Sequence, residues 1–358
     1  LGPCAPRVIH LLCPSHPVST SARTDMSNSS NNDILLAIST PPFWHCGRTI
    51  RKNSLHTLAA LAPAAVLALA HWGVSAMRVM ALAVLTAMIT EAVCQTLMKQ
   101  KLSQDNGTAA ITGLMLAFLL PASAPWWIVV IGAAAAIGIG RMAFGGYGAN
   151  QVSAALVGWA LVFVSFPVYM DPSSSLLGSS FADPLFKAKF FGGTAVADIP
   201  LSDLLLGNQL GGLGATQTGA LFLGGMYLAL MGVIRWEIPC SFLIGVLLSA
   251  SALHLADASL YAGPFFHIFS GSTVLAAFFL ATEDSCSPHR RLPMLLYGLT
   301  GGILVMLIRT YGIYTDGAPF AVMLINLLAP MFALIRSHPF GTAPRRKGKS
   351  AGEWRSRT

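Results

Sequence analysis

The chain has 358 residues, of which 54% are apolar and only 10% are charged. Soluble domains carry roughly 25% charged residues, so this composition excludes a disordered chain, counts against an ordinary soluble enzyme and predicts a polytopic membrane protein. The net charge of +8 comes from basic residues that flank apolar segments, and no basic stripe interleaved with aromatic residues indicates nucleic-acid binding. The six cysteines include no CxxC pair, which argues against an iron–sulfur cluster or a structural zinc site.

Residues 1–47 differ from the rest of the chain because they mix Pro, His, Cys and Ser with a polar run, SNSSNN, at 27–32. No apolar core of signal-peptide length with a small-residue cleavage site precedes the first apolar segment. We expect 1–47 to be a disordered or cytoplasmic N-terminal segment.

Ten apolar segments follow. A membrane span needs about 20 apolar residues, and shorter segments are possible where a helix is broken or re-entrant. They cover residues 54–71, 74–97, 108–122, 125–140, 151–170, 216–233, 238–256, 265–281, 293–310 and 317–336. We therefore predict an all-α membrane protein with about ten transmembrane helices. Its parts are a first five-helix repeat at 48–170, an outer (periplasmic) loop at 171–215, a second five-helix repeat at 216–336 and a basic cytoplasmic tail at 337–358.

The lysines and arginines set the orientation of these segments. With residue 48 in the cytoplasm, alternate crossing leaves few basic residues after residue 47 on the outer side: Arg78, Lys187, Lys189 and Arg309. The other basic residues of this region then lie in the cytoplasm, as the positive-inside rule requires, and both termini are cytoplasmic. Five segments in each half mean that the second half starts from the opposite side, so related halves would form an inverted repeat.

The third and eighth segments are short and contain glycine, at Gly113 and Gly271. Short or glycine-interrupted segments at corresponding positions indicate discontinuous helices and a site near the membrane midplane. We predict that both glycines lie on an ion path, and the alternative is two short, unbroken helices. Glu91 is a third candidate for this path, because a carboxylate inside a membrane segment is costly and indicates function. Its alternative role is an ion pair with a neighbour or a contact with the interface.

Nucleotide-binding, metalloprotease and serine-hydrolase motifs do not occur in a usable context. Composition and spacing therefore leave two classes open, a transporter and an electron-transfer subunit.

Several motifs, in order, resemble those of RnfD, a membrane component of the Rnf electron-transport complex, in a family that includes NqrB of the sodium-translocating NADH:quinone reductase. They are TGLMLAFLLP at 112–121 with PWW at 125–127, FGGYGAN at 144–150, DLLLGN at 203–208, GGLGAT at 211–216, FFLATE at 278–283 and YTDG at 314–317. The resemblance covers roughly residues 40–340. It implies that Asn150 and Asp316, which lie in two of these motifs, contribute to a cofactor site.

The resemblance also implies FMN bound through its phosphate to a threonine on the outer side, within an S-x-A-T-P-L motif. Residues 180–185 read SFADPL, so Asp183 stands where the family has the threonine. An aspartate cannot form the threonyl phosphoester, which puts covalent attachment of FMN at this position in doubt. Thr216, in a G-A-T sequence, is the alternative attachment point, and riboflavin is a second flavin to consider.

We therefore predict a membrane subunit of an Rnf-type complex in the bacterial inner membrane. The resemblance implies flavin-mediated electron transfer between reduced ferredoxin and NAD, coupled to sodium or proton transport. Ferredoxin and NAD would reach this chain only through partner subunits of the complex, and its other contacts would be with membrane lipid. The alternative is a secondary solute or ion transporter on the same inverted-repeat fold with no redox role.

Overall fold

A computed structural model describes residues 49–99, 104–170, 183–196 and 199–334. Helices dominate these ranges, which contain no β-strand, so the predicted all-α class is confirmed for the described part of the chain. The predicted N-terminal segment 1–47, the basic tail 337–358 and residues 180–182 of the SFADPL motif lie outside the described residues.

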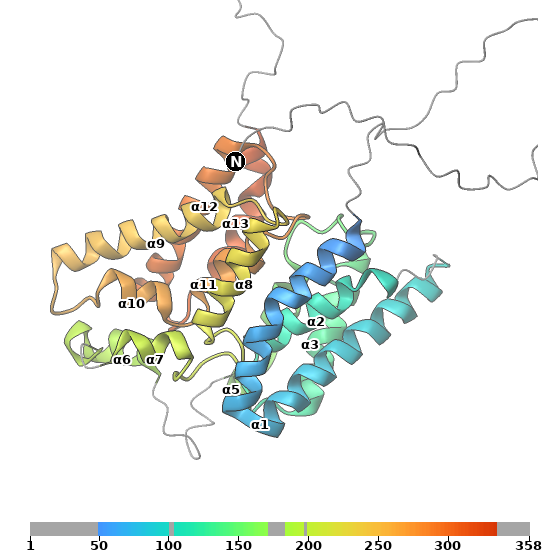
Figure 1. Cartoon of the computed structure of the whole chain (residues 1–358), viewed down its shortest axis with the longest axis horizontal. Helices are drawn as coiled ribbons and strands as arrows, with labels where there is room; N and C mark the ends of the chain where they lie inside the picture. The colour runs from blue at the N-terminus through green and yellow to red at the C-terminus, as the bar shows by residue number, and fades with distance from the viewer. Residues whose placement is uncertain (1–48, 100–103, 171–182, 197–198, 335–358) are drawn as a thin grey trace, which may run out of the picture. The chain divides into compact units, whose positions relative to one another are not determined.

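The first helix is sharply bent. α1 (Ile50–Leu97) has 48 residues and contains Gly73 in a non-helical conformation, with φ 57° and ψ −132°. Only glycine adopts such a backbone without strain, so the bend falls between the predicted segments 54–71 and 74–97. Figure 1 shows the two arms of α1 meeting at this bend. At 1.5 Å per residue each arm is roughly 35 Å long, enough to cross a hydrocarbon core of about 30 Å.

Shorter helices complete the first half: α2 (Thr108–Leu119), α3 (Trp126–Gly138), α4 (Ala154–Ser165) and α5 (Pro167–Met170). α2 and α3 pack against α1, and α4 packs against α3. The interruption predicted at Gly113 is not found, because α2 is continuous through this residue. Gly113 allows close packing instead, since a Cβ there would lie 2.7 Å from the Ala83 carbonyl oxygen of α1.

The interval predicted as an outer loop contains structure of its own. It holds α6 (Pro184–Phe191), the 3₁₀ turn η4 (Gly193–Val196) and α7 (Leu201–Leu206). Residues 207–217 then enter the core without helical structure, and the Leu213 amide donates to the Leu120 carbonyl at 2.8 Å. Glycines permit this approach, because a Cβ on Gly212 would lie 2.5 Å from the Phe118 carbonyl oxygen.

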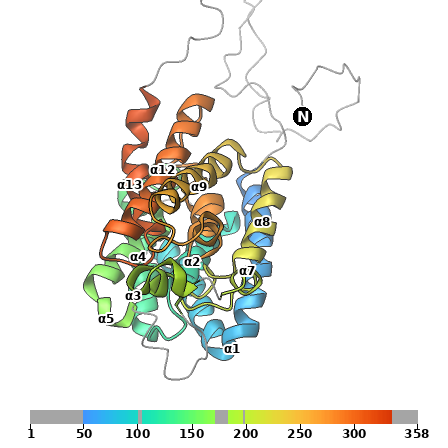
Figure 2. The same cartoon turned by 90° about the vertical axis from the view of Figure 1, so that its left-hand side faces the viewer.

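The second half consists of α8 (Thr218–Leu230), α9 (Glu237–Ala256), α10 (Pro264–Phe269), α11 (Thr273–Leu275), the π-helix η5 (Ala276–Leu280), α12 (Arg291–Tyr311) and α13 (Ala318–Ala333). The predicted interruption at Gly271 is confirmed, because this residue has φ +67° between α10 and α11. α12 packs mainly against α9 and α13, and α8 joins the halves by packing on α1 (Figure 2).

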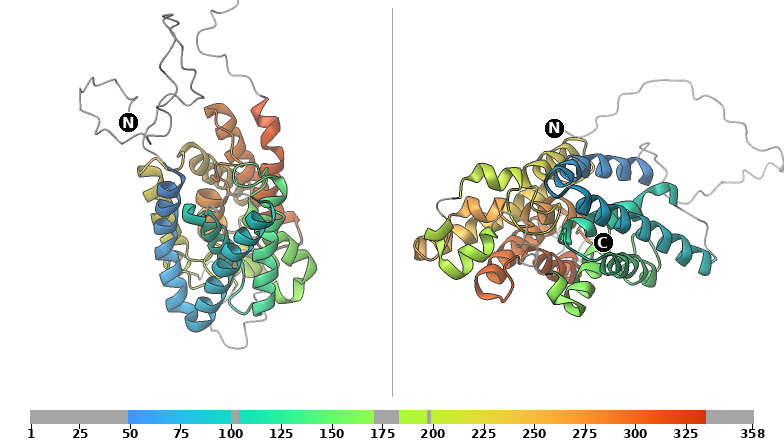
Figure 3. Two further views of the ribbon diagram at one scale, coloured as in Figure 1. Left: turned by 90° about the vertical axis from the view of Figure 1, so that its right-hand side faces the viewer. Right: turned by 90° about the horizontal axis from the view of Figure 1, so that it is seen from below.

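Within the described residues, four helical stretches are long and apolar enough to cross a membrane: Ile50–Leu97, Trp126–Phe144, Glu237–Ala256 and Arg291–Tyr311. The shorter apolar helices are Thr108–Leu119, Ala154–Ser165, Thr218–Leu230 and Ala318–Phe332. The first arm of α1, α8 and α13 lie roughly along one common axis in the side views of Figures 2 and 3. One apolar cluster of buried residues spans both halves, which is the organisation expected of a multi-pass membrane protein.

Candidate functional site

A buried arginine organises one end of the helix bundle. Arg141 follows α3 and is 2% exposed, and its Nη1 lies 3.3 Å from Oε1 of Glu91, which is 3% exposed. Nη1 also donates to the Thr108 hydroxyl at 3.2 Å, and Nη2 donates to the Thr112 hydroxyl at 2.9 Å. We call Glu91, Thr108, Thr112 and Arg141 the Arg141 cluster. Glu91 therefore pairs with a neighbour, as its alternative role required, and the pair is buried.

Two polar side chains from separate halves meet beside this cluster. Asn150 is 2% exposed, and its amide donates to the Val152 carbonyl at 3.1 Å and to Oε1 of Glu283 at 3.4 Å. Glu283 is half-buried in the segment that follows η5. Burial raises the pKa of the Glu283 carboxyl above its ordinary value, although Arg141 and the hydrogen bonds oppose this shift.

Two neighbouring cavities lie beside the Arg141 cluster. A small cavity of about 90 Å³ is lined by Arg141, Thr108, Thr112, Glu283, Phe278 and Phe279, among others. An open cavity of about 590 Å³ shares three lining residues with it: Asn53, Tyr147 and Asp284. The shared residues place the two cavities next to each other, at the end of the bundle where α1 and α12 begin.

A second buried arginine organises the opposite end. Arg309, in the last turn of α12, is 4% exposed, and its Nη2 lies 3.1 Å from Oδ1 of Asp316. Its other partners are at the break between α10 and α11: the His267 carbonyl at 2.7 Å, the Ser270 carbonyl at 3.0 Å and the Thr273 hydroxyl at 2.7 Å. We call His267, Ser270, Thr273, Arg309 and Asp316 the Arg309 cluster.

Further hydrogen bonds hold the break at Gly271 in place. The Ser272 amide and hydroxyl donate to Oδ2 of Asp316 at 2.9 and 2.5 Å. The Gly271 amide donates to the side chain of Gln209 at 3.3 Å, and Gln209 in turn donates to the Phe269 carbonyl at 3.2 Å. Gln209 thereby connects the broken segment to the buried stretch 207–217. Freed backbone groups inside a membrane protein need such partners.

A large cavity with aromatic walls lies at this second end. Its volume is about 810 Å³, and its lining includes Trp159, Phe163, Phe186, Phe190, Tyr314, Phe320, Asp183, Lys187, Asp316, Gly271 and Ser272. Tyr314 stacks on Phe320 with ring centroids 4.8 Å apart, and Phe163 contacts both rings edge-on. We call this space the aromatic cavity.

Asp183 lies at the mouth of the aromatic cavity as the N-cap of α6. Its Oδ1 accepts hydrogen bonds from the backbone amides of Leu185 at 3.0 Å and Phe186 at 3.2 Å. Amides at a helix N-terminus are the groups that bind a phosphate, and here the carboxylate uses them. Thr216 lies elsewhere: it is 1% exposed, and its hydroxyl donates to the Gly212 carbonyl at 3.2 Å.

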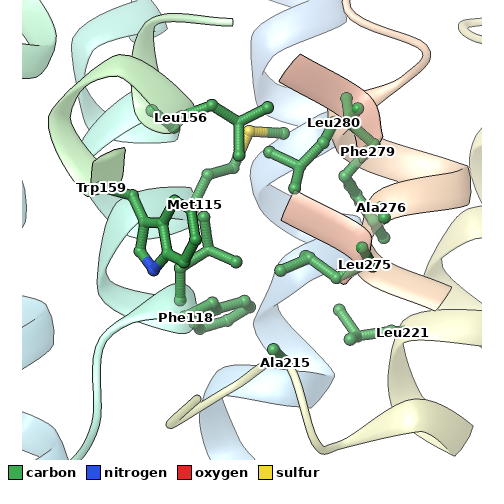
Figure 4. Packing of buried hydrophobic residues seen from close by; sticks show 14 of the residues in the cluster. Met115, Phe118, Leu156, Trp159, Ala215, Leu221, Leu275, Ala276, Phe279 and Leu280 are labelled. Carbon is green, nitrogen blue, oxygen red and sulfur yellow. The ribbon is translucent and has the colours of Figure 1, made fainter. Parts of the chain in front are cut away.

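The small cavity and the aromatic cavity lie at opposite ends of the same helices. α2 starts with Thr108 in the Arg141 cluster and ends with Leu119 in the wall of the aromatic cavity. The segment α11–η5 runs the other way, from Ser272 at the aromatic cavity to Phe279 at the small cavity. Between the cavities the side chains are apolar: Met115, Phe118, Leu156, Trp159, Leu275, Ala276, Phe279 and Leu280 pack together (Figure 4).

The structure places five of the predicted site residues in two groups and two outside them. Glu91 and Asn150 lie near the Arg141 cluster, whereas Asp183, Gly271 and Asp316 lie at the aromatic cavity. Gly113 and Thr216 are buried in backbone packing. From the sequence, Arg141 and Arg309 served only as markers of orientation, and Glu283 had no predicted role. A signal for all three exists in the sequence, because charged residues within or beside apolar segments indicate a site.

Comparison with known proteins identifies relatives of the chain. The family model described as "NQR2, RnfD, RnfE family" matches residues 37–341. A protein of Acetobacterium woodii, named as the D-subunit of a Na(+)-translocating ferredoxin:NAD(+) oxidoreductase complex, is 32% identical over 307 residues, which cover 84% of this chain and 93% of the relative. A protein of Klebsiella pneumoniae is named as the D-subunit of an ion-translocating oxidoreductase complex. It is 33% identical over 338 aligned residues, and the match covers 83% of this chain and 96% of the relative.

Proposed function

Because this chain belongs to the NQR2, RnfD, RnfE family, we propose that it acts as the RnfD component of an Rnf-type ion-translocating complex. It is a membrane subunit of an ion-translocating ferredoxin:NAD oxidoreductase, and the other subunits of that complex are its partners. The observation that carries this role is the pair of cavities, which are separated by an apolar core and each lie beside a buried arginine that is paired with a carboxylate. Ferredoxin and NAD act through the partner subunits.

The proposed architecture is ten membrane segments in two inverted repeats of five, with both termini in the cytoplasm of a bacterium and the chain in its inner membrane. The opposite directions of α2 and α11–η5 between the same two cavities support the inversion. So does the buried arginine that lies at or just after the end of the fourth segment of each half and binds the start of the third segment. The distribution of basic residues in the sequence supports the orientation.

The proposed ion path runs from the open cavity through the small cavity and the apolar core to the aromatic cavity. Glu91 and Glu283 provide carboxylates at the first end, and Asp316 provides one at the second end. Gly271 lines the aromatic cavity at the break, and Gly113 brings α2 close to α1. Carboxylates and backbone carbonyls are the groups that hold hard cations such as Na⁺. Passage through the apolar core requires the segments around it to move.

The proposed cofactor is a flavin in the aromatic cavity, held without a covalent bond. Stacked and edge-on rings of Phe163, Tyr314 and Phe320 suit a planar ring system. A phosphoester at Asp183 does not fit, because this carboxylate cannot form it and already uses the α6 amides. When bound, a flavin would supply one-electron transfer at this end of the chain. The chain's own residues provide aromatic walls and exclude phosphate from the α6 N-terminus.

The test is purification of the complex that contains this chain, followed by reconstitution in liposomes. We expect the other Rnf-type subunits to co-purify and reduced ferredoxin plus NAD⁺ to drive Na⁺ or proton movement across the liposome membrane. Absence of co-purifying redox subunits, together with ion or solute movement that needs no electron donor, would overturn the proposal in favour of a secondary transporter.

The flavin is tested on the same preparation by acid denaturation. We expect the intact mass of this chain to equal its sequence mass, and flavin to appear in the supernatant. Phe320→Ala should lower the released flavin relative to the wild-type complex, whereas Trp236→Ala, an exposed aromatic residue outside the aromatic cavity, should not. A chain that carries a flavin adduct after denaturation would refute non-covalent binding.

A further inference from the structure

Arg141 and Arg309 occupy matching positions in the two halves of the chain. Both are almost completely buried, at 2% and 4% exposed, and both lie at or just after the end of the fourth helical segment of their half, α3 and α12. Each is followed within a few residues by a tyrosine, Tyr147 or Tyr314, in a glycine-containing turn. In both guanidinium groups Nε has no hydrogen-bond partner, so the terminal nitrogens make all of the contacts.

The two guanidinium groups bind the same part of each half. Arg141 binds the first turns of α2, through the Thr108 hydroxyl and carbonyl and the Thr112 hydroxyl. Arg309 binds the start of the broken segment, through the carbonyls of His267 and Ser270 and the Thr273 hydroxyl. A guanidinium can reach several acceptors at once because its donors form a rigid planar fork.

The bound segments are the ones that build the apolar core between the cavities. α2 contributes Met115 and Phe118, and α11–η5 contributes Leu275 and Phe279 (Figure 4). The carbonyls at the break need partners, because water would otherwise have to satisfy them inside the protein. Arg309 also lies next to the wall of the aromatic cavity. Gly271 lines this cavity, and a Cβ on Gly271 would be 3.0 Å from Nη2 of Arg309.

Each arginine also holds the carboxylate at its own end of the path. Glu91 is bound by Arg141, and Asp316 by Arg309 and Ser272. A cation that binds Glu91 or Asp316 must therefore compete with a guanidinium for the carboxylate. The same contact that fixes the helix end thus also reduces cation binding beside the apolar core.

From this arrangement we infer that Arg141 and Arg309 are positioning residues that keep the ion path closed while no electrons are transferred. The inference rests on the proposed ion path. Each arginine holds one end of a helical segment whose middle forms the apolar core, and we call this set of hydrogen bonds a clamp. Loss of either clamp therefore lets water and cations pass without electron transfer. The two clamps act at opposite ends of the path.

The experiment measures passive Na⁺ and proton entry into liposomes that contain the whole complex, with no electron donor present. Arg141→Gln and Arg309→Gln should each raise this leak at least several-fold over that of the wild-type complex. Arg235→Gln is the matched control, because Arg235 is exposed and donates to the His289 carbonyl at 2.9 Å. Its leak should equal that of the wild type.

A double variant separates clamping from simple charge neutralisation. If Arg309 serves only to neutralise Asp316, then Arg309→Gln with Asp316→Asn should be as tight as the wild type, which would overturn the inference. We expect the double variant to leak, because the carbonyls at the break remain unheld. Should a glutamine variant fail to assemble, Arg309→Lys and Arg141→Lys carry the test. They should leak more than the wild type, since lysine carries its donors on one nitrogen and cannot reach all of the acceptors that Nη1 and Nη2 of each arginine bind, and an unchanged leak would overturn the inference.

The assay distinguishes this inference from the proposed function. If the wild-type complex moves no ions when electrons flow from ferredoxin to NAD⁺, the proposed function fails. The leak measurement needs no electron donor, so it still decides whether the arginines close a path.

Discussion

The buried pair between Glu91 and Arg141 leads to a stability prediction that depends directly on its burial. Glu91→Ala removes the carboxylate and leaves the guanidinium, 2% exposed, without its ion-pair partner. Removing one partner of a buried ion pair costs about 3–5 kcal/mol, because the remaining charge stays desolvated. A surface pair contributes only about 0–1 kcal/mol.

The assay is thermal unfolding of the detergent-solubilised complex, followed by tryptophan fluorescence. With roughly 2–4 °C per kcal/mol for chains of a few hundred residues, Glu91→Ala should lower Tm by about 6–20 °C. Glu237→Ala is the control, because its partner Arg291 is 89% exposed at 3.9 Å. That variant should change Tm by about 4 °C or less, as expected of a surface pair.

Replacing both partners gives the decisive comparison. Glu91→Ala combined with Arg141→Met removes both charges, and the Thr112 hydroxyl keeps a partner because it donates to the Thr108 carbonyl at 3.1 Å. The double variant should therefore be more stable than Glu91→Ala alone. A Tm of Glu91→Ala within about 1 °C of the wild type would show that water reaches this pair, and it would refute the reasoning.

Three further predictions concern other parts of the molecule. Gly271→Ala should lower Tm, because φ is +67° there and the new Cβ would lie 2.7 Å from Cδ1 of Leu185; an unchanged Tm would contradict the close packing at the break. Glu283→Gln should remove part of the pH dependence of Tm. Burial raises the pKa of this carboxyl in the folded chain, so wild-type stability falls as pH rises above the unfolded pKa, and a variant with the same slope would contradict this. Tyr297→Phe should cost about 1–3 kcal/mol, because the Asn326 carbonyl oxygen loses the tyrosine hydroxyl in a fully buried site, and Tyr297→Phe with Asn326→Leu should recover stability in the same melting assay.

The membrane character of the chain and the positions of its helices could be predicted from the sequence. Apolar segments and the scarcity of charge are one-dimensional features, so they identify helices without knowledge of contacts. The break at Gly271 was predictable for the same reason, because glycine with a positive φ is a local property. Gly113 shows the limit of such local features: its lack of a side chain serves packing against Ala83, which only the neighbouring helix reveals.

The outer interval shows a second limit. Its polar composition predicts a loop, yet residues 207–217 are largely buried between the halves. The reason is that its amides bind carbonyls at the end of α2, such as those of Phe118 and Leu120. Polarity on its own cannot distinguish a solvent-exposed loop from a backbone segment whose hydrogen bonds are satisfied inside a membrane protein.

The sequence by itself therefore determined the class of protein, the apolar segments and the substitution at Asp183, since each depends on residue types along the chain. Only the tertiary structure decided which charged residues belong together. Arg141 and Glu91 are 50 residues apart in sequence, and Asn150 and Glu283 are 133 apart, yet both pairs meet at one end of the bundle. Helix packing decides such contacts, because a buried charge is stable only where folding brings it a partner.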